Sequence, residues 1–379
     1  RITIAGIFFQ GGAASVDTGT IVAALVHGLT GSTLAVGAAA AIARYGWLFP
    51  QLIVGWLAQR HRRRLSFYLV GAGGRVLCLA GVAALVALAG AAPGAPTIIA
   101  FFALWTLYAF VSGIVAVPYN DIVARSIASE RRSRMLALRF FGGGLLAIGV
   151  VALAARLLEV LAFPDGYAAI LSLGALLLLV STLSFASAGE PQAPPAHRQG
   201  FVAFLRDGVR VLRHDRRFRW FLYSQWAAGV VAMALPFYVL QVTTAAAAKS
   251  QVAFLLGAQT LGALLSNPLW GWWGDVRGKR SLLQGVAVFA GLAPSLTLLW
   301  LTTGRPVAVL PWFTGVFVLL GAVGNGGTIA QLGYLMEISP DAHRPAYSGY
   351  FNALVAPAAL LPLAGAVVAE LLSYAAVFA

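Results

Sequence analysis

The stretch GWLAQRHRRRLSF, residues 55–67, sets four arginines and a histidine side by side between two long apolar segments. A second stretch of the same kind, GWWGDVRGKRSLL, occupies residues 271–283 of the 379-residue chain. The two copies align as Gly55 with Gly271, Trp56 with Trp272, Gln59 with Asp275, Arg63 with Lys279 and Arg64 with Arg280. Because the copies lie about half a chain apart, the repetition indicates two similar halves.

The overall composition is that of a membrane protein. Of the 379 residues, 60% are hydrophobic and only 10% are charged, and the mean hydropathy is +0.84. Soluble domains contain about 25% charged residues. About 20 apolar residues in a helix cross a hydrocarbon core of about 30 Å, and such runs follow one another along this sequence. We therefore expect an all-α protein that crosses the membrane many times.

The apolar runs predict eleven membrane-spanning helices. They cover residues 3–26, 34–58, 65–89, 97–121, 135–158, 166–188, 217–243, 251–274, 281–302, 306–335 and 346–371. The final SYAAVFA, residues 373–379, is expected to be the beginning of a twelfth helix, truncated in this chain. The first run is expected to be a span rather than a signal peptide, because no small-residue cleavage site ends it and further spans follow.

The distribution of positive charge predicts the orientation of these helices. Cytoplasmic loops are enriched in Lys and Arg, and the loops after the even-numbered helices hold most of the 26 lysines and arginines. The loops on the other side hold only Arg156, Lys249 and Arg305. We therefore expect a multi-pass protein of the cell membrane with a cytoplasmic amino terminus. The net charge of +14 then reflects topology and contact with membrane lipids, and no nucleic-acid partner is expected.

A second pair of similar loops supports the duplication. SIASERRSR, residues 126–134, aligns with EISPDAHRP, residues 337–345. Repeats of this size are common among secondary transporters. The expected domains are an amino-terminal six-helix bundle, a cytoplasmic linker and a carboxy-terminal bundle, over residues 1–188, 189–216 and 217–379.

The linker combines a proline-rich segment with an amphipathic basic helix. Apolar and small residues recur at helical spacing at Phe201, Phe204, Leu205, Gly208, Val209 and Leu212. Arginines fall largely on other positions of the same segment, which is typical of a helix that lies along a membrane surface. We expect this helix to tether the two bundles, and a partner-binding helix is the alternative.

The duplicated loop resembles the signature loop of the major facilitator superfamily, Gly-x-x-x-Asp-Arg-x-Gly-Arg-Arg. The residues of the second copy that fit this pattern are Gly271, Asp275, Gly278, Lys279 and Arg280. Val276 replaces the first arginine there, while in the first copy Gln59 replaces the acidic residue and Arg62 the second glycine. With the twelve-helix pattern and the duplication, the resemblance covers the whole chain.

The resemblance implies two six-helix bundles, related by pseudo-two-fold symmetry, that rock about a central site and open alternately to each side. The signature loop in such proteins helps to latch the bundles together in the outward-open state. It implies a gating role for Gly55, Gln59, Arg60, Arg63, Asp121, Gly271, Asp275, Gly278, Lys279 and Arg280. Asp121 is the expected partner of Arg60 or Arg63. Because Gln59 is uncharged, the latch formed by the first copy of the loop is expected to be weaker or to use other residues. Anchoring of the arginines in anionic headgroups is the alternative.

Charged residues inside membrane spans mark candidate sites, because each costs about 2.5–3.5 kcal/mol at a helix centre. Asp17 and Arg44 lie at similar depths in the first two predicted spans and form a candidate pair. Two roles stay open for it. Proton or substrate binding at Asp17 could compete with Arg44, or the two could form a permanent structural ion pair, which would lower the Asp17 pKa.

Other polar residues complete the set of candidates. Arg139 could line the inner mouth of the central cavity or extend toward the headgroups. In the second half, Gln225, Trp226 and Asn325 could bind substrate or hold helices together. Arg75 lies in a helix that is peripheral in the family that the chain resembles, so a structural partner is expected for it.

Some activities do not fit the sequence. It has no Gly-x-x-x-x-Gly-Lys-Ser/Thr loop, so ATP hydrolysis is not expected. Cys78 is the single cysteine and the five histidines are scattered, so no disulfide, metal site or other cofactor is expected. We expect a transport protein and not an enzyme.

The sequence therefore predicts a monomeric secondary transporter of a small organic solute, driven by a substrate or ion gradient. The excess of arginine over acidic residues in the spans favours an anion, and proton coupling through Asp17 is an accompanying hypothesis. Two alternatives remain. One is an exporter of amphipathic compounds or lipids, which an apolar cavity with Trp and Phe would favour. The other is a non-transporting protein of the same fold that assists membrane assembly.

Overall fold

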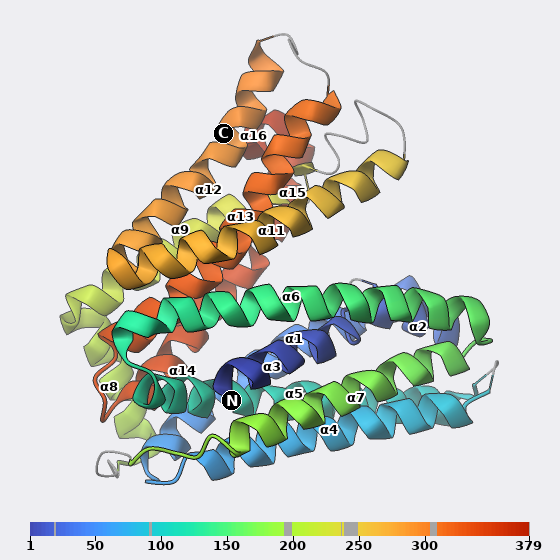
Figure 1. Ribbon diagram of the computed structural model, residues 1–379, viewed down its shortest axis with the longest axis horizontal. Helices are drawn as coiled ribbons and strands as arrows, with labels where there is room; N and C mark the ends of the chain where they lie inside the picture. The colour runs from blue at the N-terminus through green and yellow to red at the C-terminus, as the bar shows by residue number, and fades with distance from the viewer. Residues whose placement is uncertain are drawn as a thin grey trace. The chain divides into compact units, whose positions relative to one another are not determined.

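The computed structural model describes residues 1–18, 20–90, 93–192, 199–235, 237–238, 249–303 and 309–378, and within them the regular structure is helical (Figure 1). The helices are α1 (Ile2–Ala14), α2 (Ile21–Thr30), α3 (Thr33–Gln59), α4 (Leu65–Leu88), α5 (Ala95–Ser126), α6 (Ser129–Val160), α7 (Asp165–Ala186), α8 (Phe201–His214), α9 (Arg216–Ala232), α11 (Lys249–Val276), α12 (Lys279–Thr302), α13 (Val309–Ile338), α14 (Arg344–Val355), the 3₁₀ helix η1 (Ala356–Leu360), α15 (Leu361–Leu371) and α16 (Tyr374–Phe378). The predicted all-α class is confirmed.

The helices follow the predicted spans except at three places. The first predicted span, 3–26, is divided into α1 and α2 by residues 15–20. The last, 346–371, is divided into α14, η1 and α15. The predicted helix 217–243 corresponds to α9, and its residues 236 and 239–243 lie outside the described part of the chain, as do residues 193–198 of the linker and the loop residue Arg305.

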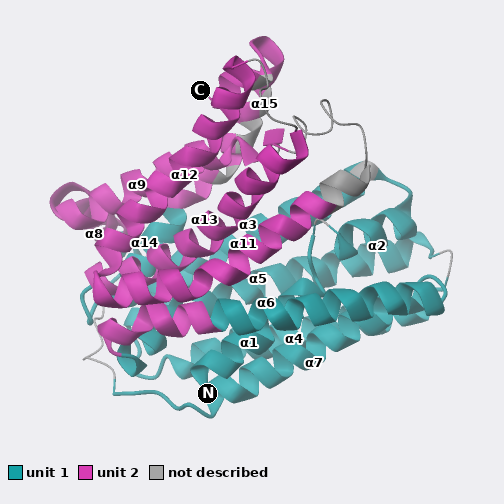
Figure 2. Ribbon diagram, turned by 45° about the horizontal axis from the view of Figure 1, so that its top comes forward, with its two compact units in different colours: residues 1–127, 139–204, 339–353 teal, residues 128–138, 205–338, 354–379 magenta. Residues whose placement is uncertain are grey.

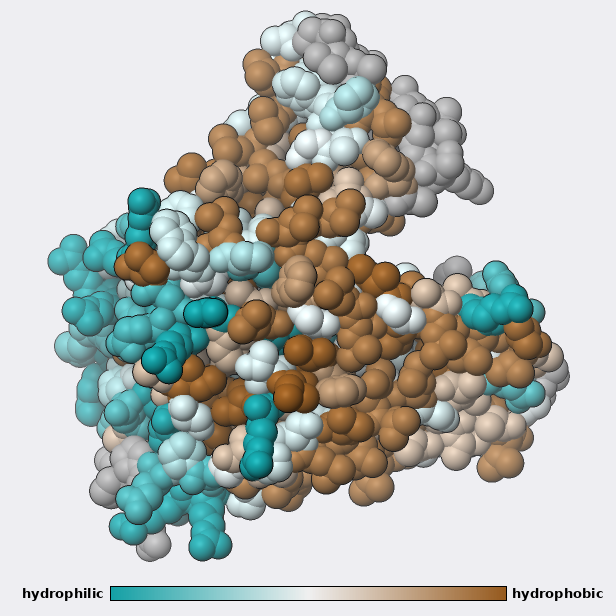
Figure 3. Space-filling view, viewed as in Figure 1, coloured by the Kyte–Doolittle hydropathy of each residue, from teal (hydrophilic) through white to brown (hydrophobic). Residues whose placement is uncertain are grey.

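Apolar helices of membrane-spanning length recur along the described residues. Six helices, α4, α5, α6, α7, α12 and α13, are long and apolar enough to cross a membrane. Hydrophobic residues cover the middle of α6 and much of α4 and α7, and hydrophilic residues gather over α8 and at the ends of α6 (Figure 3). This pattern is that of an integral membrane protein.

The chain forms two compact units (Figure 2). Unit 1 contains Arg1–Ile127, Arg139–Phe204 and Ser339–Ala353. Unit 2 contains Ala128–Leu138, Leu205–Ile338 and Leu354–Ala379. Each unit therefore includes a short segment from the other half of the sequence: unit 1 includes most of α14, and unit 2 includes the start of α6.

Each unit has its own apolar core. Leu25, Leu79 and Trp105 lie in the core of unit 1, and Trp300 and Phe313 lie in that of unit 2. Buried tryptophans need a hydrogen-bond partner for the indole N–H. Trp105 on α5 donates to the backbone carbonyl of Ala39 on α3 at 2.9 Å, which fixes the ring.

In each unit, neighbouring helices pack closely at glycine. A Cβ on Gly113 of α5 would lie 2.2 Å from the carbonyl oxygen of Trp47 on α3. A Cβ on Gly321 of α13 would lie 1.8 Å from the carbonyl oxygen of Gln259 on α11. Small residues at such positions let helix backbones approach closely, which is how helices associate in membranes.

We predict that Gly321→Ala destabilises the protein. The added methyl group would clash with the backbone of α11, and the clash is relieved only if α11 and α13 move apart. Overpacking of this kind costs about 1–3 kcal/mol. The matched control is Gly324→Ala on the same helix, where a Cβ meets nothing within 4 Å. Thermal unfolding in detergent is the measurement, and equal unfolding temperatures for the two variants would contradict the packing described.

Candidate functional site

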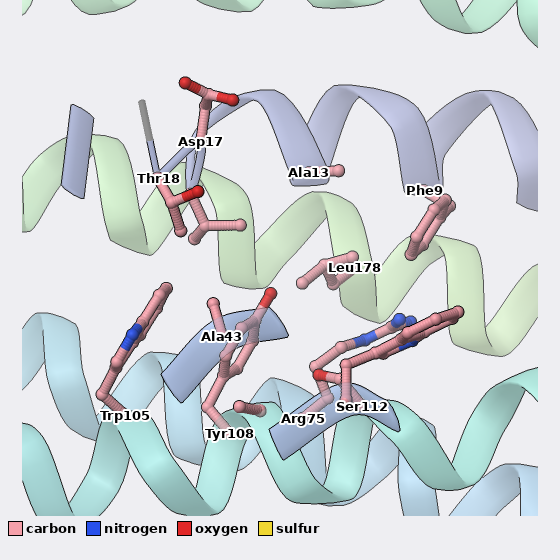
Figure 4. A pocket seen from close by; sticks show the side chains of 13 residues that line it. Phe9, Ala13, Asp17, Thr18, Ala43, Arg75, Trp105, Tyr108, Ser112 and Leu178 are labelled. Atoms are coloured by element: carbon pink, nitrogen blue, oxygen red, sulfur yellow. The ribbon is translucent and has the colours of Figure 1, made fainter. Parts of the chain in front are cut away.

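A cavity of about 280 Å³ lies inside unit 1 (Figure 4). Its walls come from the end of α1 and the residues after it, and from α3, α4, α5 and α7. The lining residues are Phe9, Ala13, Val16, Asp17, Thr18, Ala43, Trp47, Arg75, Trp105, Tyr108, Ala109, Ser112 and Leu178. The walls are thus mainly apolar and aromatic, with one carboxylate and one guanidinium among them.

The break between α1 and α2 brings Asp17 to this cavity. The Ser15 hydroxyl donates to the Gly12 carbonyl at 2.7 Å, and the Thr20 hydroxyl donates to the Asp17 carboxylate at 2.8 Å. Such local side-chain bonds compete with helical bonds. A broken helix inside an apolar span is tolerated where it lines a cavity and is a feature of transporter binding sites.

Arg75 on α4 is the cation of the cavity. Its side chain is buried, with 4% of its surface exposed, and its guanidinium carbon lies 4.9 Å from the centre of the Phe9 ring. Its Nε has no hydrogen-bond partner, and no ion pair involving Arg75 occurs within the described part of the chain. The structural partner expected for Arg75 is therefore not found among these residues.

Arg139 on α6 approaches the same phenylalanine. Its guanidinium carbon lies 5.4 Å from the centre of the Phe9 ring, and its Nη1 donates to the Tyr119 hydroxyl at 2.7 Å. The stem of Arg139 passes α1 at Gly6, where a Cβ would lie 2.4 Å from the Arg139 Cγ. Arg139 is buried and does not extend to the surface.

The predicted Asp17–Arg44 pair is not the arrangement that the cavity shows. Arg44 is exposed and is absent from the cavity lining. Arg75 and Ser112 lie across the cavity from Asp17 and Thr18, and the Asp17 carboxylate does not point toward Arg75 (Figure 4). The cation that shares the cavity with Asp17 is thus Arg75.

The three candidates from the second half of the sequence make contacts within unit 2. The Trp226 indole donates to the Leu354 carbonyl at 3.1 Å. The Asn325 amide donates to the Ala263 carbonyl at 3.0 Å, which joins α13 to α11, and the Gln225 amide lies 3.4 Å from the Ser224 hydroxyl. For Trp226 and Asn325 the contacts are those of residues that hold helices together.

Asp121 is the centre of a buried charge cluster in unit 1. Its carboxylate lies 2.5 Å from Arg64, 2.6 Å from Arg125 and 3.7 Å from Arg344. Arg125 also pairs with Glu190 at 2.8 Å. We call these five residues the Asp121 cluster, which joins the start of α4, the end of α5, the linker and the start of α14.

The predicted partner of Asp121, Arg60 or Arg63, was wrong, since the partner from this loop is Arg64. Arg64 immediately precedes α4 and is fully buried. The Glu190 carboxylate accepts hydrogen bonds from the backbone N–H groups of Arg64 and Leu65 at 2.9–3.1 Å, which satisfies the start of α4 and holds Arg64 in place. Arg60 lies over the Trp56 ring at 4.9 Å, and Arg63 is exposed.

A second cluster lies in unit 2 around Asp275. Its carboxylate accepts hydrogen bonds from the backbone N–H groups of Ser133 at 2.9 Å and Arg134 at 2.8 Å, near the start of α6. Lys279 pairs with Asp275 at 3.2 Å and donates to the Ser129 carbonyl. We call Asp275, Lys279 and these three residues of α6 the Asp275 cluster.

The glycines of the duplicated loop occupy matching positions. A Cβ on Gly55 would lie 2.9 Å from the Pro345 carbonyl oxygen at the start of α14. A Cβ on Gly271 would lie 2.8 Å from the Ala137 Cβ near the start of α6. Gly278 adopts φ +86° between α11 and α12, a conformation that favours glycine. Arg280, the last of the predicted gating residues, is exposed.

The comparisons with known proteins agree with this architecture. Residues 232–379 match the model of the Major Facilitator Superfamily. Uncharacterized proteins of Mycobacterium tuberculosis and Mycobacterium bovis are 23% identical over 238 residues, which is 62% of this chain. The match spans about half, 46%, of the length of these relatives.

Solved transporter structures have a similar fold. A bacterial homologue of the iron transporter ferroportin, in an outward-facing state, aligns with 99% of this chain and 95% of its own at a TM-score of 0.78 and 14% identity. The proton:xylose symporter XylE aligns with 100% and 91% at a TM-score of 0.70 and 14% identity. FucP aligns with 99% and 94% at a TM-score of 0.72 and 12% identity.

The helices, the broken first span and the structural matches define an integral membrane protein with a transporter fold. Residues 232–379 carry the match to the Major Facilitator Superfamily, and the chain as a whole shares its fold with the solved transporters. The predicted fold class is confirmed, and the predicted resemblance to this superfamily is confirmed over residues 232–379.

We predict opposite effects of two similar substitutions on α3. Gln59 is fully buried, and among the described residues neither polar atom of its side chain has a hydrogen-bond partner. Gln59→Met therefore removes an unsatisfied amide and raises the free energy of unfolding by about 1 kcal/mol. Gln51 is equally buried but donates to the Trp47 carbonyl at 3.0 Å and accepts from Asn352. Gln51→Met should lower the free energy of unfolding by about 1–3 kcal/mol.

Thermal unfolding of the two variants in detergent tests this pair. A loss of stability in Gln59→Met as large as that in Gln51→Met would show that Gln59 has a bonded role in the first latch.

Proposed function

We propose that the protein is a secondary transporter that moves a small organic anion by alternating access. The observation that carries the proposal is the cavity beside the broken first span, in which the buried Arg75 has no carboxylate partner within the described residues. Leaving a guanidinium buried without an anion costs several kcal/mol. An anionic substrate in the cavity would supply the missing charge.

The substrates in the names of the structural relatives are not assigned to this chain, because sequence identities of 12–14% support similarity of fold alone. One relative is a homologue of an iron transporter. The described residues of this chain hold no group of three or more His, Cys, Asp or Glu that could bind a metal ion. The positive charge of Arg75 in the cavity likewise favours an anion over a metal cation.

The apolar and aromatic walls favour an anion with an apolar body. Phe9, Trp47, Trp105 and Tyr108 line the same cavity as Arg75. This feature also supports the alternative of an exporter for amphipathic compounds, which differs from the main proposal in direction rather than in site.

The two charge clusters support alternating access. The Asp121 cluster joins α4 and α5 to the start of α14, and the Asp275 cluster joins α11 and α12 to the start of α6. Each cluster thus connects segments from opposite halves of the sequence. We propose that both clusters open and re-form during the transport cycle, and that Asp17 carries the coupled proton.

We further propose that the protein lies in the cell membrane with its basic loops in the cytoplasm. Arg62→Cys, in the loop between α3 and α4, should escape a membrane-impermeant thiol reagent in intact cells. Glu159→Cys, at the exposed end of α6, should be labelled. Cys78 is buried and gives little background. Labelling of Arg62→Cys alone would reverse the orientation.

We predict that proteoliposomes containing the purified protein take up small radiolabelled organic acids, such as acetate, succinate or benzoate, but not xylose or ferrous iron. Arg75→Gln should reduce uptake at least tenfold, since a charge-assisted bond of about 1.5–3 kcal/mol is lost. Asp17→Asn should remove the dependence of uptake on a pH gradient. Uptake of xylose or iron that is unchanged in Arg75→Gln would contradict the proposal.

A further inference from the structure

We infer that the cavity in unit 1 is a binding site for a small aromatic monocarboxylate, with its carboxylate on Arg75 and its ring against the aromatic wall. This inference rests on the proposed function and narrows its substrate class. Four properties of the cavity support it: the charge of its lining, the unused hydrogen-bond donors of Arg75, the aromatic side chains of its wall, and its volume.

The charge around the cavity suits a single negative charge. Arg75 lines the cavity, and the guanidinium carbons of Arg75 and Arg139 lie 4.9 and 5.4 Å from the centre of the Phe9 ring. Asp17 also lines the cavity, but it is exposed and its carboxylate points away from Arg75 (Figure 4). The buried positive charge of Arg75 is therefore the charge that a monocarboxylate in the cavity would neutralise.

The Arg75 guanidinium is free to bind a carboxylate. Within the described residues its Nε has no hydrogen-bond partner, and the guanidinium lies over the face of Phe9 and interacts electrostatically with Tyr108 and Tyr68, none of which is a carboxylate. A guanidinium can bind a carboxylate through two parallel N–H···O bonds, and a face-on ring leaves its edge available for them. The Arg139 guanidinium differs, because it already donates to Tyr119.

The aromatic wall is built from rings that are held in place. The Trp105 ring is stacked on the Tyr108 ring, with centroids 5.0 Å apart and an interplanar angle of 12°. Phe101 continues this stack on the other side at 6.3 Å and 12°. The bond from Trp105 to Ala39 fixes the stack. Planar rings bind such surfaces by stacking or edge contacts that add to simple burial of area.

The cavity has room for a ligand with a single ring. Its volume is about 280 Å³, which accommodates the nine non-hydrogen atoms of benzoate. The volume lies near the lower end of ligand pockets, about 300–1,000 Å³.

The test is equilibrium binding to the purified protein by titration calorimetry, with three matched probes. Benzoate has the charge and the ring, benzamide has the ring without the charge, and cyclohexanecarboxylate has the charge without an aromatic ring. We expect benzamide to bind at least tenfold more weakly than benzoate, and cyclohexanecarboxylate about twofold to tenfold more weakly. This comparison uses the unaltered protein, so it does not depend on the folding of a variant.

Variants then locate the site. Arg75→Gln should weaken benzoate binding about tenfold to a hundredfold. Arg75→Lys should weaken it less, since lysine keeps the positive charge but lacks the two parallel N–H donors of the guanidinium. Arg156→Gln, an exposed arginine of α6 that pairs with Glu159, is the control and should bind benzoate as the unaltered protein does.

Several outcomes would overturn the inference. They are equal binding of benzoate and benzamide, equal binding of benzoate and cyclohexanecarboxylate, the absence of benzoate binding, or benzoate binding unchanged in Arg75→Gln. The result also separates this inference from the proposed function. Benzoate binding without uptake into proteoliposomes would support the site and contradict transport, whereas uptake of aliphatic acids without benzoate binding would do the reverse.

Discussion

The ion pairs of the buried Asp121 carboxylate hold together one end of unit 1, where the α3–α4 loop, the end of α5 and the start of α14 meet. Its side chain is fully buried and lies within 4 Å of three guanidiniums, from Arg64, Arg125 and Arg344. Removing one partner from a buried ion pair typically costs about 3–5 kcal/mol, because the other charge is left buried. The positions of the α3–α4 loop, the end of α5 and the start of α14 are therefore fixed together. Glu190 completes the arrangement, since it neutralises Arg125 and also satisfies the first backbone N–H groups of α4.

Arg75 provides the contrast that points to function. It is almost as buried as Arg64, but within the described residues it meets an aromatic ring where Arg64 meets a carboxylate. The quadrupole of a ring recovers about 2 kcal/mol for a desolvated cation, less than the cost of burying the charge. A protein that retains such a residue beside a cavity gains by it when an anion occupies that cavity. The same reasoning explains why Asp17 and Arg75 lie on opposite walls, since a direct pair would already satisfy the guanidinium.

Composition and spacing were enough to predict most of the helices and the fold class, because a membrane span is long and its apolar signal accumulates over about 20 residues. Single-residue contacts were harder. Arg60, Arg62, Arg63 and Arg64 are equivalent in a charge count, and only the end of α3 at Gln59 and the start of α4 at Leu65 decide which side chain turns inward. The break after α1 had a signal that could have been used, since SVDTGT, residues 15–20, is rich in residues that favour turns. Arg75 was assigned to the periphery by family resemblance, and its position in the cavity depends on packing between α1, α4 and α5 that no local pattern encodes.

In both copies of the duplicated loop a carboxylate lies near the start of a helix, but it comes from a different sequence position in each copy. In the second copy, Asp275 binds backbone N–H groups near the start of α6. In the first copy, the equivalent residue is the uncharged Gln59, whose amide has no partner, and the negative charge comes instead from Asp121 on α5. That carboxylate approaches Arg344, the first residue of α14, and not the helix backbone. Hydrogen bonds to backbone N–H groups are fixed in direction, whereas a pair between a carboxylate and a long arginine side chain can persist while the helix shifts. The contact of Asp121 with Arg344 in unit 1 therefore tolerates more movement than the contacts of Asp275 with the start of α6 in unit 2.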